Sequence, residues 1–305
     1  MPIRDNKLTY FSTVAVFVLL WSSAFAVGKI ALQVSPPQLF LGVRFLISGM
    51  FLVGFALISG RYRPLGAMGW AKLAVLGVIN QAGYQGLAWI AMGEVSSALA
   101  AVIISMNPIF IAMLAVPVLG ERMSVRRGAG LALGILGVVI VLSSRITVSG
   151  EDVGGILIMA VSLTSVVVGS ILFKKWNTDA PLSLTVGGQF LSAGALLLSL
   201  GLVTEDVSQI VFGADYVFVM AYIVFAVSIG AVGLWFYLLT HGSASDASAL
   251  HFLMPPFGLM FGWLLLGEHA ALGDFIGIVP IAIGIWLATH KRKSSPVLSP
   301  VKAEA

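Results

Sequence analysis

The sequence lacks cysteine and has few charged residues. Of its 305 residues only 10% are Asp, Glu, Lys or Arg, whereas 59% are hydrophobic; a soluble globular chain carries roughly 25% charged residues. So few ionic groups cannot cover a water-facing surface, which excludes soluble enzymes and nucleic-acid-binding proteins. The absence of cysteine excludes disulfides and thiolate metal sites. A mean hydropathy of +1.03 instead indicates a polytopic membrane protein.

Long apolar runs fill most of the chain and are separated by short connectors. A membrane span needs about 20 mainly apolar residues, and division at charge and turn clusters gives ten such segments. They cover residues 11–33, 37–59, 69–92, 96–119, 127–144, 153–173, 181–203, 215–239, 245–267 and 272–290. The sequence therefore predicts an all-α polytopic membrane protein with ten transmembrane helices.

The distribution of the basic residues predicts how the spans are oriented. The chain has 17 Lys and Arg residues, and an N-terminus in the cytoplasm places 14 of them on the cytoplasmic side. These are Arg4, Lys7, Arg61, Arg63, Lys72, Arg122, Arg126, Arg127, Lys174, Lys175, Lys291, Arg292, Lys293 and Lys302. Arg145 falls outside, and Lys29 and Arg44 lie within spans. Because cytoplasmic loops carry an excess of Lys and Arg, we expect a bacterial-type cytoplasmic (inner) membrane protein with both termini in the cytoplasm.

The second half of the sequence repeats the first. Residues 98–137 align with residues 245–284 at a constant spacing of 147, and the spacing is 145 near the start of each half. The matching residues include Pro108 with Pro255, Gly120-Glu121 with Gly267-Glu268, and Arg44 with Gln189. Each half holds five spans, an odd number, so the second half enters the membrane from the opposite side.

This repeat predicts the architecture. We expect a first five-helix repeat at residues 1–150, a second, inverted five-helix repeat at residues 151–290, and a basic cytoplasmic tail at residues 291–305. Inverted repeats are typical of secondary transporters, in which the substrate binds near the membrane midplane and the two halves move for alternating access. The repeat therefore favours a transporter with a central cavity between its halves.

Two motifs resemble a known family. The segment Leu20-Trp21-Ser22-Ser23-Ala24-Phe25 is similar to the family's opening Leu-Trp-Gly-Ser-x-Phe pattern, and the paired Pro…Leu-Gly-Glu stretches resemble its duplicated repeat. On these motifs, residues 11–290 resemble the drug/metabolite transporter superfamily, specifically its EamA-type ten-helix exporters. The resemblance implies export of amino acids, aromatic ones among them, or of related small metabolites.

The sequence leaves other functions open. Multidrug transport and the transport of nucleoside- or sugar-type metabolites would use the same fold. An intramembrane enzyme is a further alternative, but the sequence has no H-E-x-x-H or G-x-S-x-G motif, so we expect a protein that is not an enzyme. It has no P-loop either. We expect no ATP, nucleic acid, cofactor or metal, and as partners a small-molecule substrate and the lipid bilayer.

The third span carries a polar cluster. Asn80 and Tyr84 are four residues apart, as are Gln81 and Gln85, and Trp89 follows just beyond. In an α-helix this spacing places the four polar residues on one face. Lipid against that face would leave amide groups unpaired, so we expect the face to line the substrate cavity. Hydrogen bonding that only joins neighbouring helices is the alternative.

Prolines at matching positions predict a helix break in each half. Pro108 follows Asn107 in the fourth span, and Pro255 and Pro256 follow His251 in the ninth. Proline removes a backbone hydrogen bond from a helix, and matched discontinuities in two halves point to a binding site. We expect the three prolines to act as hinges, and Asn107 and His251 to face the cavity. Simple helix bending and a neutral core histidine are the alternatives.

Aromatic and basic residues within the spans complete the expected cavity. Trp21, Trp89 and Trp235 are candidates for walls that accept apolar or aromatic side chains, with packing in the core as the alternative. Arg44 lies inside the second span and needs a partner. It is a candidate anion or ion-pair site, whose partner is either Glu94 or a substrate carboxylate.

Two acidic residues, Glu121 and Glu268, match across the repeat, and each lies just before the next span. A carboxylate near a helix N-terminus stabilises that helix by ~0.3–1 kcal/mol. We expect each carboxylate to stabilise the N-terminus of the span that follows it, with a gating ion pair as the alternative.

Overall fold

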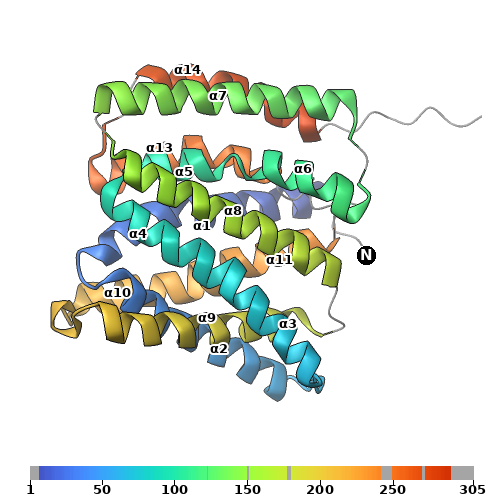
Figure 1. Ribbon diagram of the computed structural model, residues 1–305, viewed down its shortest axis with the longest axis vertical. Helices are drawn as coiled ribbons and strands as arrows, with labels where there is room; N and C mark the ends of the chain where they lie inside the picture. The colour runs from blue at the N-terminus through green and yellow to red at the C-terminus, as the bar shows by residue number, and fades with distance from the viewer. Residues whose placement is uncertain are drawn as a thin grey trace, which may run out of the picture.

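The computed structural model describes residues 7–121, 123–149, 151–176, 180–241, 249–269 and 272–289, and the regular elements within these ranges are helices. Helices occur in each of the ten predicted segments (Figure 1). Arg4, Arg122, the beginning of the ninth segment at residues 245–248 and the tail at 291–305 lie outside the described residues.

Several spans consist of more than one helical piece. The first half contains α1 (Lys7–Leu32), α2 (Pro37–Ile58), α3 (Ala67–Gly77), η2 (Val78–Gly86), α4 (Leu87–Glu94), α5 (Ser97–Ile104), α6 (Asn107–Leu119) and α7 (Val125–Ser149). The second half contains α8 (Val153–Trp176), α9 (Leu182–Thr204), η3 (Val207–Gln209), α10 (Ala214–Tyr222), η4 (Ile223–Ala231), α11 (Val232–His241), η5 (Ala249–Leu253), α13 (Met254–Leu266) and α14 (Leu272–Thr289).

Most of these stretches have the length and composition of membrane spans. Among the described residues, seven helical stretches are long and apolar enough to cross a membrane, and Met254–Leu266 and Leu272–Gly284 are shorter apolar helices. The stretch from α3 to α4 falls outside both groups. It is also the stretch that carries Asn80, Gln81 and Gln85, whose amides lower its hydropathy. The least apolar segment of the bundle is thus the one with the polar cluster.

The two halves pack symmetrically on each other. The matching helices α2 and α9 pack together at one edge of the molecule, and the matching helices α7 and α14 pack together at the opposite edge (Figure 1). Between these pairs, α1 contacts η4 and α13 of the second half, and α8 makes the equivalent contacts with η2 and α6 of the first. Each half therefore buries its apolar faces against the other.

Glycines permit the close approach of the matching helices. A Cβ atom on Gly137 of α7 would lie 2.5 Å from the carbonyl oxygen of Gly277, and one on Gly284 of α14 would lie 2.5 Å from that of Gly130. These two contacts are the same contact repeated after 147 residues. Small residues let backbones meet in this way where helix association depends on packing, which explains the matched glycines in the sequence.

The repeat also reproduces irregular backbone. The segments η2 and η4 are π-helical, nine residues long and 145 residues apart.

The helices α6 and α13 each have 13 residues and end at glycines with positive φ angles, 68° at Gly120 and 66° at Gly267. Glycine adopts this left-handed conformation without steric cost and ends helices for that reason.

Carboxylates of the second half hold helices of the first half at one end of the bundle. Glu205, which follows α9, accepts hydrogen bonds from the backbone N–H groups of Gln38 (3.0 Å) and Leu39 (2.9 Å) in the first turn of α2. Glu268 accepts hydrogen bonds from the N–H groups of Ser97 (2.8 Å) and Ala98 (3.2 Å) in the first turn of α5. These carboxylates satisfy N–H groups that have no partner within their own helix.

The position of Glu268 corrects one expectation. Its carboxylate stabilises a helix N-terminus, as expected, but that helix is α5 of the other half and not α14, which follows it in the sequence. The physical reason is that α13, which ends at Gly267, packs against α5, so that Glu268 lies beside the first turn of α5. The residues that match Ser97 and Ala98 lie outside the described residues.

Candidate substrate site

A small cavity lies at the centre of the bundle, where α1, α2, α4, η2, η4 and α11 meet. Its volume is about 30 Å³, which holds roughly two water molecules because one needs at least ~10–15 Å³. Its walls are formed by Trp21, Ala24, Phe25, Arg44, Tyr84, Gln85, Ala88, Trp89, Met92, Val227 and Val232. Both halves contribute to the walls.

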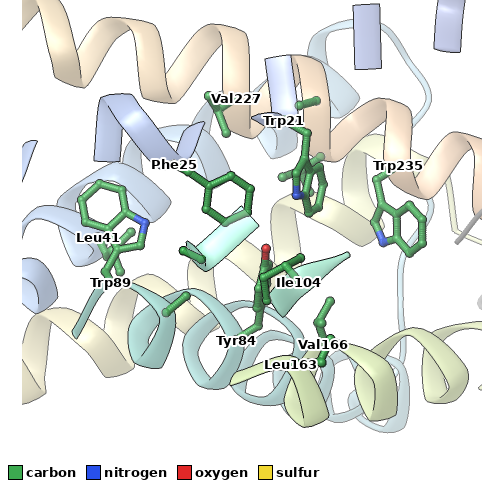
Figure 2. Close-up of a cluster of buried hydrophobic side chains, with 14 of the residues drawn as sticks. Trp21, Phe25, Leu41, Tyr84, Trp89, Ile104, Leu163, Val166, Val227 and Trp235 are labelled. Atoms are coloured by element: carbon green, nitrogen blue, oxygen red, sulfur yellow. The ribbon is translucent and has the colours of Figure 1, made fainter. Parts of the chain in front are cut away.

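Aromatic side chains make up much of the wall. Trp21, Phe25, Tyr84 and Trp89 come from three different elements and point toward the same central region (Figure 2). The rings of Trp21 and Tyr84 are stacked with centroids 6.4 Å apart. Phe40 stacks behind Trp89 at 5.3 Å. Such walls favour an apolar or aromatic group on the ligand.

Arg44 is the charged residue of the wall. Its side chain is 1% exposed, and its Nε donates a hydrogen bond to Oγ of Ser228 in η4 (2.8 Å). The guanidinium carbon lies 4.8 Å from the ring centroid of Phe45 and 5.9 Å from that of Trp89. Within the described part of the chain, Nη2 has no hydrogen-bond partner. Arg44 thus presents an unused donor in a buried site.

The protein partner of Arg44 is Ser228 and not Glu94. Glu94 lies at the end of α4, where its Cβ is close to Gly155 of α8. Across the ranges that the structure covers, no hydrogen bond or electrostatic interaction joins Glu94 to Arg44. The ion pair considered from the sequence is therefore absent from this conformation.

The polar cluster of the third span is divided between the cavity and the surrounding helices. Tyr84 and Gln85 line the cavity, whereas Asn80 and Gln81 do not. Nε2 of Gln85 donates to Oε1 of Gln81 (2.8 Å), and Nδ2 of Asn80 donates to Oε1 of Gln189 in α9 (3.4 Å). Two of the four residues therefore face the cavity, and the other two hydrogen-bond behind it.

Trp235 and His251 pack beside the cavity without lining it. Their ring centroids are 4.6 Å apart, and His251 also lies 5.4 Å from the ring of Trp21. Trp21 is thus the link between this aromatic cluster and the cavity wall. Nε1 of Trp235 is buried and has no hydrogen-bond partner among the described residues.

The expected helix breaks occur in both halves. Residues 105 and 106 separate α5 from α6, and Pro108 occupies the first turn of α6. In the second half the 3-10 segment η5, which contains His251, leads directly into α13, with Pro255 and Pro256 in the first turn. Asn107 is fully buried, and neither atom of its amide has a partner in the described residues. It does not line the cavity.

Sequence reasoning did not identify Ser228, Val227 or Val232, which come from the second half. Ser228 had one detectable signal, because a buried arginine requires an acceptor and Ser228 is a polar residue in an otherwise apolar span. The valines carried no signal, since they resemble any other apolar residue of a span. In the part of the chain that is described, no group of three or more His, Asp or Glu residues could hold a metal ion.

Comparison with known proteins places these features in context. A family model described as the EamA-like transporter family matches residues 9–143 and residues 153–289. The chain is similar to the transporter YvbV of Bacillus subtilis, with 29% identity over 282 residues that cover 92% of this chain and 91% of that protein. It is also similar to the inner membrane transporter YedA of Escherichia coli, with 25% identity over 307 residues that cover 98% of this chain and 97% of that protein.

A plant relative and a solved structure extend the comparison. A chloroplastic WAT1-related protein of Arabidopsis thaliana is 26% identical over 275 residues, which cover 88% of this chain and 66% of that longer protein. One crystal structure superposes with a TM-score of 0.73 at 21% identity, covering 91% of this chain and 98% of the other. At this identity the superposition shows a shared fold.

Proposed function

Since the chain belongs to the EamA-like transporter family, we propose that it exports amino acids, aromatic ones among them, or related small metabolites by alternating access. Membership makes the chain a membrane transporter and not an enzyme, because its relatives are named as transporters. The direction of transport and the substrate belong to the proposal. So do a location in a bacterial inner membrane, the number of spans and the cytoplasmic position of both termini.

The central cavity is the observation that carries this proposal. It lies between the two halves, both halves line it, and its wall combines aromatic rings with Arg44, Tyr84 and Gln85. These groups suit a ligand with a carboxylate and an apolar side chain. A buried guanidinium disfavours a lipophilic cation at the same place, which argues against multidrug export of cations.

The symmetric packing of the halves supports alternating access. The contacts of α1 with η4 and α13 have their counterparts in the contacts of α8 with η2 and α6. If the two halves exchange their conformations, the same contacts re-form with the cavity open to the other side. The breaks before Pro108 and Pro255 are the positions where we expect the helices to bend.

A flux measurement tests the proposed function. Purified protein in proteoliposomes is loaded with amino acids, nucleosides or lipophilic cations, and efflux is followed with and without a pH gradient. We expect aromatic amino acids to cross faster than in protein-free liposomes, and Tyr84→Phe to raise the apparent KM by about tenfold because one hydrogen bond to the ligand is lost.

The control variant is Met113→Ala, since Met113 is an exposed side chain of α6. Unchanged KM values in Tyr84→Phe would move the substrate site away from this cavity. Absence of flux for every compound, with the fold retained, would remove the proposed function.

A further inference from the structure

The charge of the cavity wall limits which ligands it accepts. The wall contains one ionisable cation, Arg44, and no carboxylate. Arginine stays protonated in proteins, so the empty cavity carries a net positive charge in a region of low dielectric. A bound group of opposite charge gains the most from such a site.

The neighbours of Arg44 leave part of its guanidinium free for a ligand. Ser228 occupies Nε, and Ser228 is itself fixed because its hydroxyl donates to the carbonyl oxygen of Ile223 (3.1 Å). Phe45 and Trp89 cover faces of the guanidinium. Nη2 is buried and unpartnered, and leaving a charged donor unsatisfied costs more than leaving a neutral one. A bound ligand can supply the missing acceptor.

The same wall offers little to an ammonium group. No carboxylate lines the cavity, and the rings of Trp89 and Phe45 already carry the guanidinium of Arg44. Gln85 and Tyr84 offer only neutral acceptor oxygens, which do not compensate a positive charge. An α-ammonium would therefore lie near a like charge without a compensating anion, which is unfavourable.

We propose that the site selects monovalent organic carboxylates with an apolar or aromatic body, that Arg44 holds the carboxylate, and that an α-ammonium group is not required. This inference rests on the proposed function and narrows it, because it ranks organic acids above the corresponding amino acids. One guanidinium without a second cation fits a monoanion and not a dianion such as a phosphate ester.

Four ligands with the same phenyl body test the ranking. They are 3-phenylpropanoate, phenylalanine, 2-phenylethylamine and 3-phenylpropanamide, which present an anion, a zwitterion, a cation and a neutral amide. Binding to the purified protein is measured by the change in tryptophan fluorescence, since Trp21 and Trp89 line the cavity. Flux is measured in proteoliposomes at pH 7.5, and the passive leak of protein-free liposomes is subtracted.

We expect the Kd of 3-phenylpropanoate to be about tenfold below those of phenylalanine, the amide and the amine, since a charge-assisted pair contributes roughly twice a neutral hydrogen bond. Arg44→Gln should raise the Kd of the acid to that of the amide and leave the Kd of the amide unchanged. Glutamine is chosen because Gln189 occupies the matching position of α9, so the fold accommodates it there.

Two further variants complete the test. Arg44→Lys keeps the charge but loses the planar fork, and should retain part of the preference for the acid. Arg126→Gln is the matched control, because Arg126 also packs on a tryptophan, 4.9 Å from the ring of Trp286, but lies outside the cavity. It should leave all four Kd values unchanged.

Three results would overturn the inference. They are equal binding of the acid and the amide, tighter binding of phenylalanine than of the acid, and an unchanged Kd for the acid in Arg44→Gln with the melting temperature retained. Should Arg44→Gln fail to fold, the ligand ranking in the unmodified protein and in Arg44→Lys decides. Transport of phenylalanine or the amine without the acid would refute this inference and leave the proposed function standing, whereas absence of flux for every compound would refute both.

Discussion

The two halves of the chain share their backbone but differ in chemistry at the centre of the bundle. The π-helical segments η2 and η4 have the same length and occupy matching places. The first carries Asn80, Gln81, Tyr84 and Gln85, whereas the polar side chain of the second is Ser228. The irregular backbone is therefore a property of the fold, and the amide and phenol groups belong to η2 alone of the two segments.

The matching helices α2 and α9 likewise share their geometry but differ in chemistry. Arg44 of α2 donates to Ser228 in η4, and its counterpart Gln189 of α9 accepts from Asn80 in η2. Each side chain thus crosses to the π-helical segment of the other half, but only one of the two contacts involves a charge. Symmetry determines where the contacts lie, and divergence between the halves determines what the site can bind.

The strongest test of the shared backbone is to disturb matching glycine contacts. Gly137→Val and Gly284→Val each place a Cβ atom 2.5 Å from a backbone oxygen, so each should lower the free energy of unfolding by about 3 kcal/mol, the upper part of the range for overpacking. The melting temperature in detergent measures both. Gly128→Val is the control, because a Cβ there meets nothing within 4 Å. A lowered melting temperature in only one of the two glycine variants would contradict symmetric packing.

The crossing contacts of the second helices should differ in strength. Ser228→Ala leaves Nε of Arg44 without its acceptor and should cost about 1.5–3 kcal/mol, the range for hydrogen bonds to charged groups. Asn80→Ala removes a longer bond between two neutral amides (3.4 Å) and should cost about 0.5–1 kcal/mol.

Chemical denaturation of both single variants and of the double variant Arg44→Gln/Ser228→Ala separates the two contacts. Compared with Arg44→Gln alone, the double variant should lose little further free energy of unfolding, because the charged partner of Ser228 is already gone. Equal losses for Ser228→Ala and Asn80→Ala would show that the charge adds nothing to this contact.

The ends of the helices should show the smallest difference between the halves. Glu205 bonds to the first turn of α2, whereas its counterpart in the first half is Gly60, which has no side chain and a φ angle of 65°. Glu205→Ala should therefore cost about 0.5–2 kcal/mol, as the loss of a helix cap does. Thermal melts beside the variant Gln209→Ala, which changes an exposed residue of η3, measure it. An equal melting temperature for both variants would show that the cap does not contribute.

Much of the fold could be predicted from the sequence because its signals are local. Apolar runs predicted the ten helical segments, spacing predicted the two repeats, and Pro108 and Pro255 predicted the breaks at α6 and α13. Contacts between the halves could not be predicted in this way. Nothing near Glu268 in the sequence indicates that its partners are Ser97 and Ala98, which lie 171 and 170 residues away.

The prediction of the site was incomplete for a geometric reason. An α-helical period places Asn80, Gln81, Tyr84 and Gln85 on one face, and Gln85 does donate to Gln81 within η2. The cavity lies beside the later turns of this stretch, where Tyr84, Gln85 and Trp89 line it, whereas Asn80 lies one turn earlier and donates to Gln189. Spacing predicted the shared face but not how far along the helix the cavity lies.

The small size of the central cavity has an electrical consequence. A space of about 30 Å³ holds roughly two waters, whereas the hydrocarbon core of a bilayer is about 30 Å thick. A continuous file of water molecules across the protein would be several times longer than this cavity allows. The cavity alone therefore supplies no hydrated path for protons or ions from one membrane surface to the other.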